Sequence, residues 1–410
     1  MRVQNCVGRR AGIVLAAAAL LLAGATGALA QKAPAADEKP SVEIYGFAML
    51  DMGFQFKQND PNWFDVLRPT KLPSFEDEFG KDGRWFSSVR QSRLGVRSSM
   101  PTEIGELKTI FEFELFGTGV DAGQTTFRLR HAWGEVGHFG AGQTWSPFMD
   151  PDVFPNSLEY WGPNGMVFFR NVQFRWTPIT GDTTAMLALE RPGASADQGL
   201  LADRIELQNV KGRFPLPDFS GAYKRSLRWG YVRGAFLLGE MKWDDVLADQ
   251  FDLSGSATRW GINLSSNLKV QKGTVRLQYV FGEGVENYMN DAPVDVGIKP
   301  NPGSAVTPIV GTALPVQGLV AFYDHTWNQK FTSSVGYSRI DIDNSDGQAP
   351  NAFKDGQYAL FNVLCTPAKN VMFGGEFQWG RRENFSDGFS SSDYRLQFSF
   401  KYNFSVKVGG

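Results

Sequence analysis

Apolar and polar side chains alternate at period two over long stretches of this chain. From Val42 to Phe56 the even positions are apolar or small, whereas the odd positions include Glu43, Asp51 and Gln55. Near the other end, apolar residues from Tyr394 to Phe404 alternate with polar residues. Successive side chains of a β-strand point to opposite faces of the sheet, so each stretch predicts a strand with one apolar face.

Similar amphipathic segments recur between these two, and no helical period competes over comparable lengths. They lie near residues 107–115, 127–133, 260–265, 275–281 and 371–379. In the second of them, strict alternation places His131 and Trp133 on the apolar face, opposite Arg128 and Arg130. The chain is therefore predicted to be all-β.

The connectors between these segments alternate between short and long. Short ones lie near 101–105, 137–140, 178–182, 224–228, 267–273, 328–330 and 367–370; long ones lie near 57–84, 117–125, 146–165, 191–217, 240–256, 283–315, 341–356 and 381–392. Short periplasmic turns, long extracellular loops and an even strand number are typical of outer-membrane barrels. We predict a transmembrane antiparallel β-barrel of about sixteen strands over residues 42–404, followed by a tail at 405–410.

Composition does not oppose a membrane location. Mean hydropathy is −0.26, which for helical proteins would indicate a soluble chain. A barrel strand faces lipid with alternate residues only, so its mean hydropathy stays low. Aromatic residues make up 13% of the chain and often stand near strand ends, among them Tyr45, Trp133 and Trp145, which favours interfacial girdles over a soluble β-sandwich.

The first thirty residues resemble a secretory signal peptide. Arg2, Arg9 and Arg10 precede an apolar run over residues 13–22, and Ala28-Leu29-Ala30 matches a cleavage site. We expect residues 1–30 to be removed on export and residues 31–41 to form a short periplasmic segment. The mature chain would keep only Cys365, so no intramolecular disulfide is expected.

Charge and motif content argue against several function classes. Without the three arginines of the signal, 38 basic residues stand against 43 acidic ones, a balance of −5 that disfavours nucleic-acid binding. The histidines at 131, 138 and 325 lack metal-ligand spacing, and neither a Gly-x-Ser-x-Gly elbow nor a phosphate-binding glycine loop is present. We expect no enzyme activity, no cofactor and no metal site.

Basic residues recur on the polar faces of the second, fourth and last predicted strands. The candidates for a basic pore lining are Arg93, Arg97, Arg128, Arg130, Arg395 and Lys401. Positive charge that lines a pore favours anions. The alternative is that these arginines pair with Glu112, Glu114 or loop acids and only hold the barrel together.

The predicted loop at 146–165 has an unusual composition for a solvated connector, because it is rich in proline, aromatic and acidic residues. We expect it to be ordered and to fold into the barrel, where it would narrow the lumen. Asp150, Asp152 and Glu159 would then stand across from the arginines as a constriction-loop acidic set. Opposed charges of this kind orient dipolar solutes.

Four sequence blocks resemble the DcaP-like family of outer-membrane porins. They are residues 90–96 (RQSRLGV), 127–135 (FRLRHAWGE), 141–150 (AGQTWSPFMD) and 160–163 (YWGP), and the similarity continues to the closing strand. The resemblance implies a homotrimer in outer-membrane lipid with a basic lumen that passes small anionic, often dicarboxylic, solutes. Some members carry a long helical segment before the barrel, whereas only residues 31–41 intervene here.

The sequence thus predicts a porin in the Gram-negative outer membrane that works by passive diffusion. Two alternatives stay open at this stage: an outer-membrane embedded hydrolase, and a soluble or adhesive β-protein.

Overall fold

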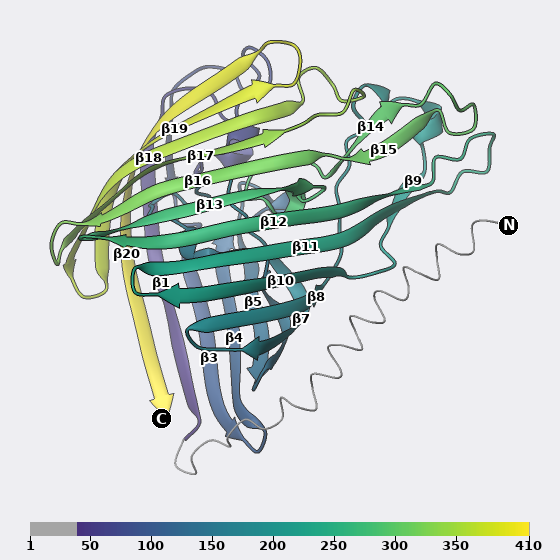
Figure 1. Cartoon of the computed structure of the whole chain (residues 1–410). Helices are drawn as coiled ribbons and strands as arrows, with labels where there is room; N and C mark the ends of the chain where they lie inside the picture. Colours follow the sequence, from purple (N-terminus) through teal and green to yellow (C-terminus); the bar gives the residue numbers. More distant parts are fainter. Residues whose placement is uncertain (1–38, 410) are drawn as a thin grey trace.

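A computed structural model describes residues 39–409 and shows a closed antiparallel β-barrel (Figure 1). The predicted signal peptide lies outside the described residues, as do residues 31–38 of the short segment after it. The barrel strands are β1 (Ser41–Gln55), β3 (Arg93–Thr102), β4 (Gly105–Phe116), β5 (Thr125–Val136), β6 (Phe139–Trp145), β7 (Arg170–Ile179), β8 (Thr183–Glu190), β10 (Asp218–Leu227), β11 (Gly230–Asp245), β12 (Gly255–Val270), β13 (Gly273–Glu283), β16 (Pro315–Thr326), β17 (Phe331–Ile342), β18 (Phe353–Ala368), β19 (Val371–Asn384) and β20 (Ser390–Gly409). These sixteen strands confirm the predicted fold class.

Shorter elements lie at the end of the barrel that carries the long loops. Strands β2 (Arg84–Ser88) and β9 (Val210–Arg213) extend the sheet beside β1 and β11, and β14 (Val296–Pro300) pairs with β15 (Ile309–Ala313) as a separate hairpin. The 3-10 helices are η1 (Pro61–Trp63), η2 (Pro69–Lys71), η3 (Gly119–Asp121), η4 (Pro151–Val153), η5 (Gly199–Leu201), η6 (Ile205–Leu207) and η7 (Glu286–Tyr288). Within residues 39–409, no helix has the length and apolarity needed to cross a bilayer.

The first and last strands close the barrel, and their pairing corrects one predicted boundary. β1 and β20 pair without interruption from Ser41–Gly409 to Gln55–Arg395. The barrel therefore does not end at residue 404, and residues 405–409 are not a tail. Val406 and Val408 continue the outward apolar row of β20 and pair with Ile44 and Val42.

The two ends of the barrel differ in their connectors, as predicted. At one end, which we call the turn end, the strands are joined by a few residues; the turn between β18 and β19 is only Lys369-Asn370. Asn370 adopts a φ of 68°, a left-handed conformation that asparagine tolerates better than most residues. At the opposite end, the loop end, the connectors are long.

The outer surface of the barrel is apolar. Leu94, Phe111, Leu264 and Phe398 lie on different strands and are each 45–51% exposed. Several aromatic residues predicted for interfacial girdles instead point inward: Tyr45 bonds to Glu112, Trp145 contacts Arg130 and Arg170, and the ring of Trp133 covers Gly140. A barrel wall with this apolar an exterior suits lipid rather than water.

A hydrophobic core fills part of the barrel interior. Phe148, Met149 and Val167, from the connector between β6 and β7, are buried against Val320 of β16 and Ile340 of β17. The connector between β13 and β16 contributes Val285, Tyr288 and Met289 to the same cluster. The interior beside β3 to β7 is instead occupied by charged side chains.

Candidate permeation site

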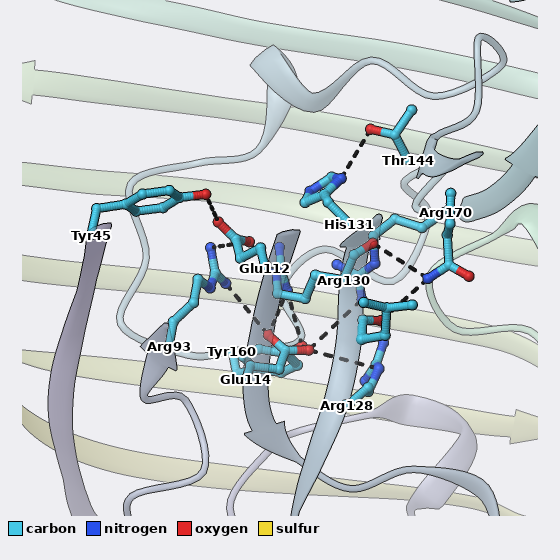
Figure 2. A network of polar contacts seen from close by, with 12 residues as sticks. Tyr45, Arg93, Glu112, Glu114, Arg128, Arg130, His131, Thr144, Tyr160 and Arg170 are labelled. Atoms are coloured by element: carbon cyan, nitrogen blue, oxygen red, sulfur yellow. Dashed lines mark hydrogen bonds and ion pairs between the residues drawn. The ribbon is translucent and has the colours of Figure 1, made fainter. Parts of the chain in front are cut away.

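Four arginines surround two glutamates on the inner wall of β3, β4, β5 and β7 (Figure 2). Strand register brings them together, because Arg93 of β3 and Arg128 of β5 both stand opposite Glu114 of β4. We call Arg93, Arg128, Arg130, Arg170, Glu112 and Glu114 the arginine cluster.

Arg130 is the most tightly paired cation of the cluster. Its Nε lies 2.7 Å from Glu112 Oε1, and its Nη1 lies 2.5 Å from Glu114 Oε2. Arg93 lies 3.5 Å from both carboxylates, and Arg128 and Arg170 approach Glu114 to 3.7 and 3.8 Å. The side chains of Arg130 and Arg170 are 5% and 6% exposed, whereas those of Arg93 and Arg128 are 24% and 25% exposed. Arg93 and Arg128 are therefore the guanidinium groups most accessible to a solute.

A β-bulge at Arg130 changes which residues face the interior. Glu112 pairs with His131 and Phe113 pairs with Leu129, so Arg130 is an extra residue in β5. Strict alternation wrongly assigned His131 and Trp133 to the apolar outer face. His131 Nδ1 instead lies 2.9 Å from Thr144 Oγ1 (Figure 2). The imidazole packs edge-on against Trp145.

Two tyrosines connect the glutamates to neighbouring elements. The Tyr45 hydroxyl of β1 donates to Glu112 at 2.8 Å. The Tyr160 hydroxyl, from the connector between β6 and β7, donates to Glu114, and its ring stacks on Phe116 at 4.0 Å. The connector therefore contacts the cluster directly.

Arg97 and Lys401 lie on the inner wall next to the cluster. Arg97 Nε is 3.2 Å from Glu43, and its guanidinium lies over Tyr45 at 4.1 Å. Lys401 Nζ lies 3.9 Å from the Phe47 ring centroid. Both cations therefore rest on inward aromatic rings of β1, an arrangement favoured by cation–π attraction.

Arg395 departs from its predicted place on the pore lining. Its side chain is fully buried, its guanidinium lies 3.8 Å from the Phe86 ring, and its three side-chain nitrogens have no hydrogen-bond partner among the described residues. The long connector between β1 and β3, which includes Phe86, covers this part of the inner wall. Arg395 is therefore not accessible to a solute in this conformation.

The three predicted loop acids occupy different environments. Asp150 is buried and accepts hydrogen bonds from Tyr231 of β11 at 2.8 Å and Ser265 of β12 at 2.5 Å. Asp152 is 52% exposed and pairs with Lys224 of β10 at 2.5 Å. These two acids lie against β10, β11 and β12, on a different part of the wall from the arginine cluster.

Glu159 is enclosed near the closing strands. It accepts hydrogen bonds from the backbone N–H groups of Leu67, at 3.2 Å, and Gly162. Burial raises the pKa of Glu159 to about 8, against the lowering effects of the Gly162 N–H and of the charge on Arg395. Of the predicted acids, only Asp152 presents its carboxylate to water.

Two cavities lie along the inner wall near the arginine cluster. A cavity of about 320 Å³ towards the loop end is lined by Trp63, Arg68, Arg128 and Tyr160, among others. A second cavity of about 470 Å³ towards the turn end is lined by residues that include Ser41, Arg97 and Trp133. Arg128 of the cluster thus lines one of these spaces, and Arg97, on the same strand as Arg93, lines the other.

Sequence reasoning missed Arg170 as a member of the cluster. It is the first residue of β7, and alternation in that strand marks Asn171 and Gln173 as inward instead. Its guanidinium turns back over Trp145 at 4.8 Å. Nothing in the local pattern predicts that turn.

Among the residues that the structure describes, no three His, Cys, Asp or Glu side chains form a group that could hold a metal ion.

A closed sixteen-strand barrel with an apolar exterior and a charged, partly filled interior defines an outer-membrane channel of the porin class. Comparisons with known proteins agree with this assignment. The family model for DcaP outer membrane protein matches residues 18–290, so the chain belongs to that family. Its members are outer-membrane channels and not enzymes. No curated protein sequence matches the chain.

Solved structures show the same fold. The crystal structure of the outer membrane channel DcaP of Acinetobacter baumannii superposes with a TM-score of 0.71 at 20% identity, over 89% of this chain and 97% of that one. An anion-selective porin from Comamonas acidovorans gives 0.55 at 10% identity, over 89% and 100%. The trimer form of OmpT, an outer membrane protein of Vibrio cholerae, gives 0.52 at 13% identity, over 89% and 99%. At sequence identities of 10–20%, these similarities establish a shared fold.

Proposed function

We propose that the protein is a passive diffusion pore for small hydrophilic solutes and that it prefers anions, carboxylates in particular. The observation that carries this proposal is the arginine cluster. Four guanidinium groups stand against two carboxylates beside the cavity that Arg128 lines, a formal excess of two positive charges. A solute in that cavity meets this excess at close range.

Local charge outweighs the negative balance of the whole chain in this proposal. Fixed charges act on a permeating ion over about one Debye length, roughly 8 Å at physiological salt. Arg93 and Arg128 keep about a quarter of their side-chain surface exposed, so their charges are within that range of a solute. Arg97 and Lys401 would extend the basic surface towards the turn end.

The connector at 146–165 serves in this proposal as the constriction. It touches the arginine cluster through Tyr160 and the opposite part of the wall through Asp150 and Asp152. Asp152 would supply the negative side of a transverse field, because it is exposed. Asp150 and Glu159 would serve mainly to hold the connector in place.

Assembly and export complete the proposal. We infer that the chain is exported by a signal peptide at residues 1–30 and assembles as a homotrimer through lipid-facing residues near the first and last strands. OmpT, which has a similar fold and a trimer form, supports the second inference. Light scattering in several mild detergents should report three copies. A monomer in every detergent would contradict the proposed trimer but not the proposed pore.

Solute uptake by proteoliposomes tests the proposed selectivity. A small dicarboxylate and the neutral diamide with the same carbon skeleton have similar size but different charge. We expect the dicarboxylate to enter several-fold faster in liposomes with the protein, and no difference in liposomes without it. Equal rates, or faster entry of the diamide, would contradict the anion preference.

A further inference from the structure

Glu114 lies at the centre of the arginine cluster. Its side chain is fully buried, and guanidinium nitrogens of Arg93, Arg128, Arg130 and Arg170 lie 2.5–3.8 Å from its oxygens. Glu112, by comparison, contacts only Arg93 and Arg130 and is also bonded to Tyr45. One carboxylate is therefore shared by every cation of the cluster.

The carboxylate of Glu114 leaves several hydrogen-bond donors of the neighbouring arginines unpaired. Among the four arginines, only Arg130 makes a short hydrogen bond to it, at 2.5 Å, and the other three lie at 3.5 Å or more. Arg93 Nε, Arg128 Nη1 and Arg170 Nη1 have no hydrogen-bond partner among the described residues. These donors are buried, so a solute at the cluster meets the incompletely offset positive charge of three arginines rather than their unpaired N–H groups.

A pore needs a site that attracts its solute but also releases it. Binding must be favourable enough for entry and weak enough for exit. Four arginines without a counter-ion would hold a dicarboxylate strongly. A negative charge within a few ångströms of all four lowers that attraction without removing it.

We propose that Glu114 is a built-in counter-anion that sets how long an anionic solute stays at the arginine cluster. This inference rests on the proposed anion preference. Glu114 keeps the formal charge of the cluster at two positive charges, and its loss would raise this to three. Because the site is largely shielded from water, one unit charge at this range should change the residence time by about tenfold or more.

Tyr160 provides the control that separates charge from packing. Its hydroxyl donates to Glu114, and its ring stacks on Phe116. Tyr160→Phe removes the hydrogen bond but keeps the ring and every charge. Its effect on the residence time should therefore be much smaller than that of a variant that removes the charge of Glu114, although it alters a contact between the connector and Glu114.

The test is single-channel recording with succinate as a current-blocking probe. Glu114→Gln, which keeps the side-chain shape, should lengthen succinate blockades about tenfold or more and shift the reversal potential further towards anions. Glu114→Gln with Arg170→Gln restores two positive charges and should return both readings towards wild type. Blockades that are unchanged or shorter in Glu114→Gln, in a wild-type background that is anion-selective, would show that Glu114 is only structural.

Two further results keep the inference separate from the proposed function. If Glu114→Gln does not assemble, Arg170→Gln alone lowers the cluster to one positive charge and should shorten the blockades; unchanged blockades would overturn the inference. A wild-type pore without anion preference would instead overturn the proposed function itself.

Discussion

The Tyr231 hydroxyl of β11 donates a 2.8 Å hydrogen bond to Asp150 and so fastens the connector between β6 and β7 to the barrel wall. Ser265 of β12 donates to the same carboxylate oxygen. The acid that the sequence suggested for the constriction is therefore an anchor, and its charge is enclosed by protein.

Loss of this anchor should loosen the connector. Asp150→Ala leaves the buried Tyr231 and Ser265 hydroxyls without their acceptor, at a cost of about 1–3 kcal/mol. We expect noisier single-channel currents with frequent transitions between conductance levels. Asp152→Ala is the matched control, because Asp152 is half exposed and its pair with Lys224 contributes little. Equally quiet currents in both variants would contradict the anchoring role.

Arg130 and Arg128 should differ in how much each stabilises the folded barrel, although both belong to the arginine cluster. Arg130→Ala removes the closest partner of two buried carboxylates and should destabilise the barrel by about 3–5 kcal/mol. Arg128→Gln removes a partly exposed cation at 3.7 Å from Glu114 and should cost about 1 kcal/mol or less. The temperature at which the folded form is lost on SDS gels measures both. A larger loss for Arg128→Gln would reverse the assigned roles.

Glu159 should make the loop region less stable as pH rises. The carboxyl of an unfolded chain ionises near its ordinary pKa of 4.5, whereas burial holds that of Glu159 at about 8. Between these values the folded state keeps a proton that the unfolded state has lost, so stability falls from pH 4.5 to about 8 and then levels off. Arg395, Glu376 and Tyr358 face this carboxyl. All three are the same in the wild type and in the Glu159→Gln variant that are compared below.

Hydrogen exchange measures this effect locally. The Leu67 and Gly162 amides donate to Glu159, so their exchange, corrected for the intrinsic pH dependence, should accelerate between pH 6 and pH 9. Glu159→Gln has no carboxyl to titrate and should remove most of the difference. Identical pH dependence in wild type and variant would show that Glu159 is not the titrating group.

The final residues of β20 should contribute to stability but not decide closure. Truncation after Phe404 removes the pairs from Tyr45–Ser405 to Ser41–Gly409, while the pairs from Gly46 to Gln55 remain. We expect a closed barrel that loses its fold at a lower temperature than wild type. Failure of the truncated chain to form any heat-modifiable species would mean that residues 405–410 are needed for assembly.

Period-two alternation was enough to predict the barrel because it reflects a constraint that acts on nearly every strand. One face must suit lipid and the other must suit the interior, so the pattern in Val42–Phe56 is visible without a structure. The same rule failed at His131, where the bulge at Arg130 shifts the register by one residue. A single inserted residue leaves no mark that simple alternation can detect.

The details of the candidate site depend on contacts distant in the sequence. Arg395 has the parity of an inward residue, yet Phe86, which belongs to another segment, covers it. Arg170 joins the cluster by turning back from the end of β7, and Asp150 is enclosed by two strands that follow it by about a hundred residues. Parity predicts the face of a strand, but it does not predict what lies over that face.

The most direct test of the account is the reversal potential of the pure protein in a planar bilayer under a salt gradient. The wild-type reversal potential should have the sign expected of an anion-selective pore. The double variant Arg93→Gln with Arg128→Gln should shift it towards the value of a cation-selective pore while the barrel stays folded. These are the two accessible cations of the cluster, so neutralising them changes the charge that a solute meets. A cation-selective wild type, or a double variant with an unchanged potential, would contradict the claim that the arginine cluster selects anions.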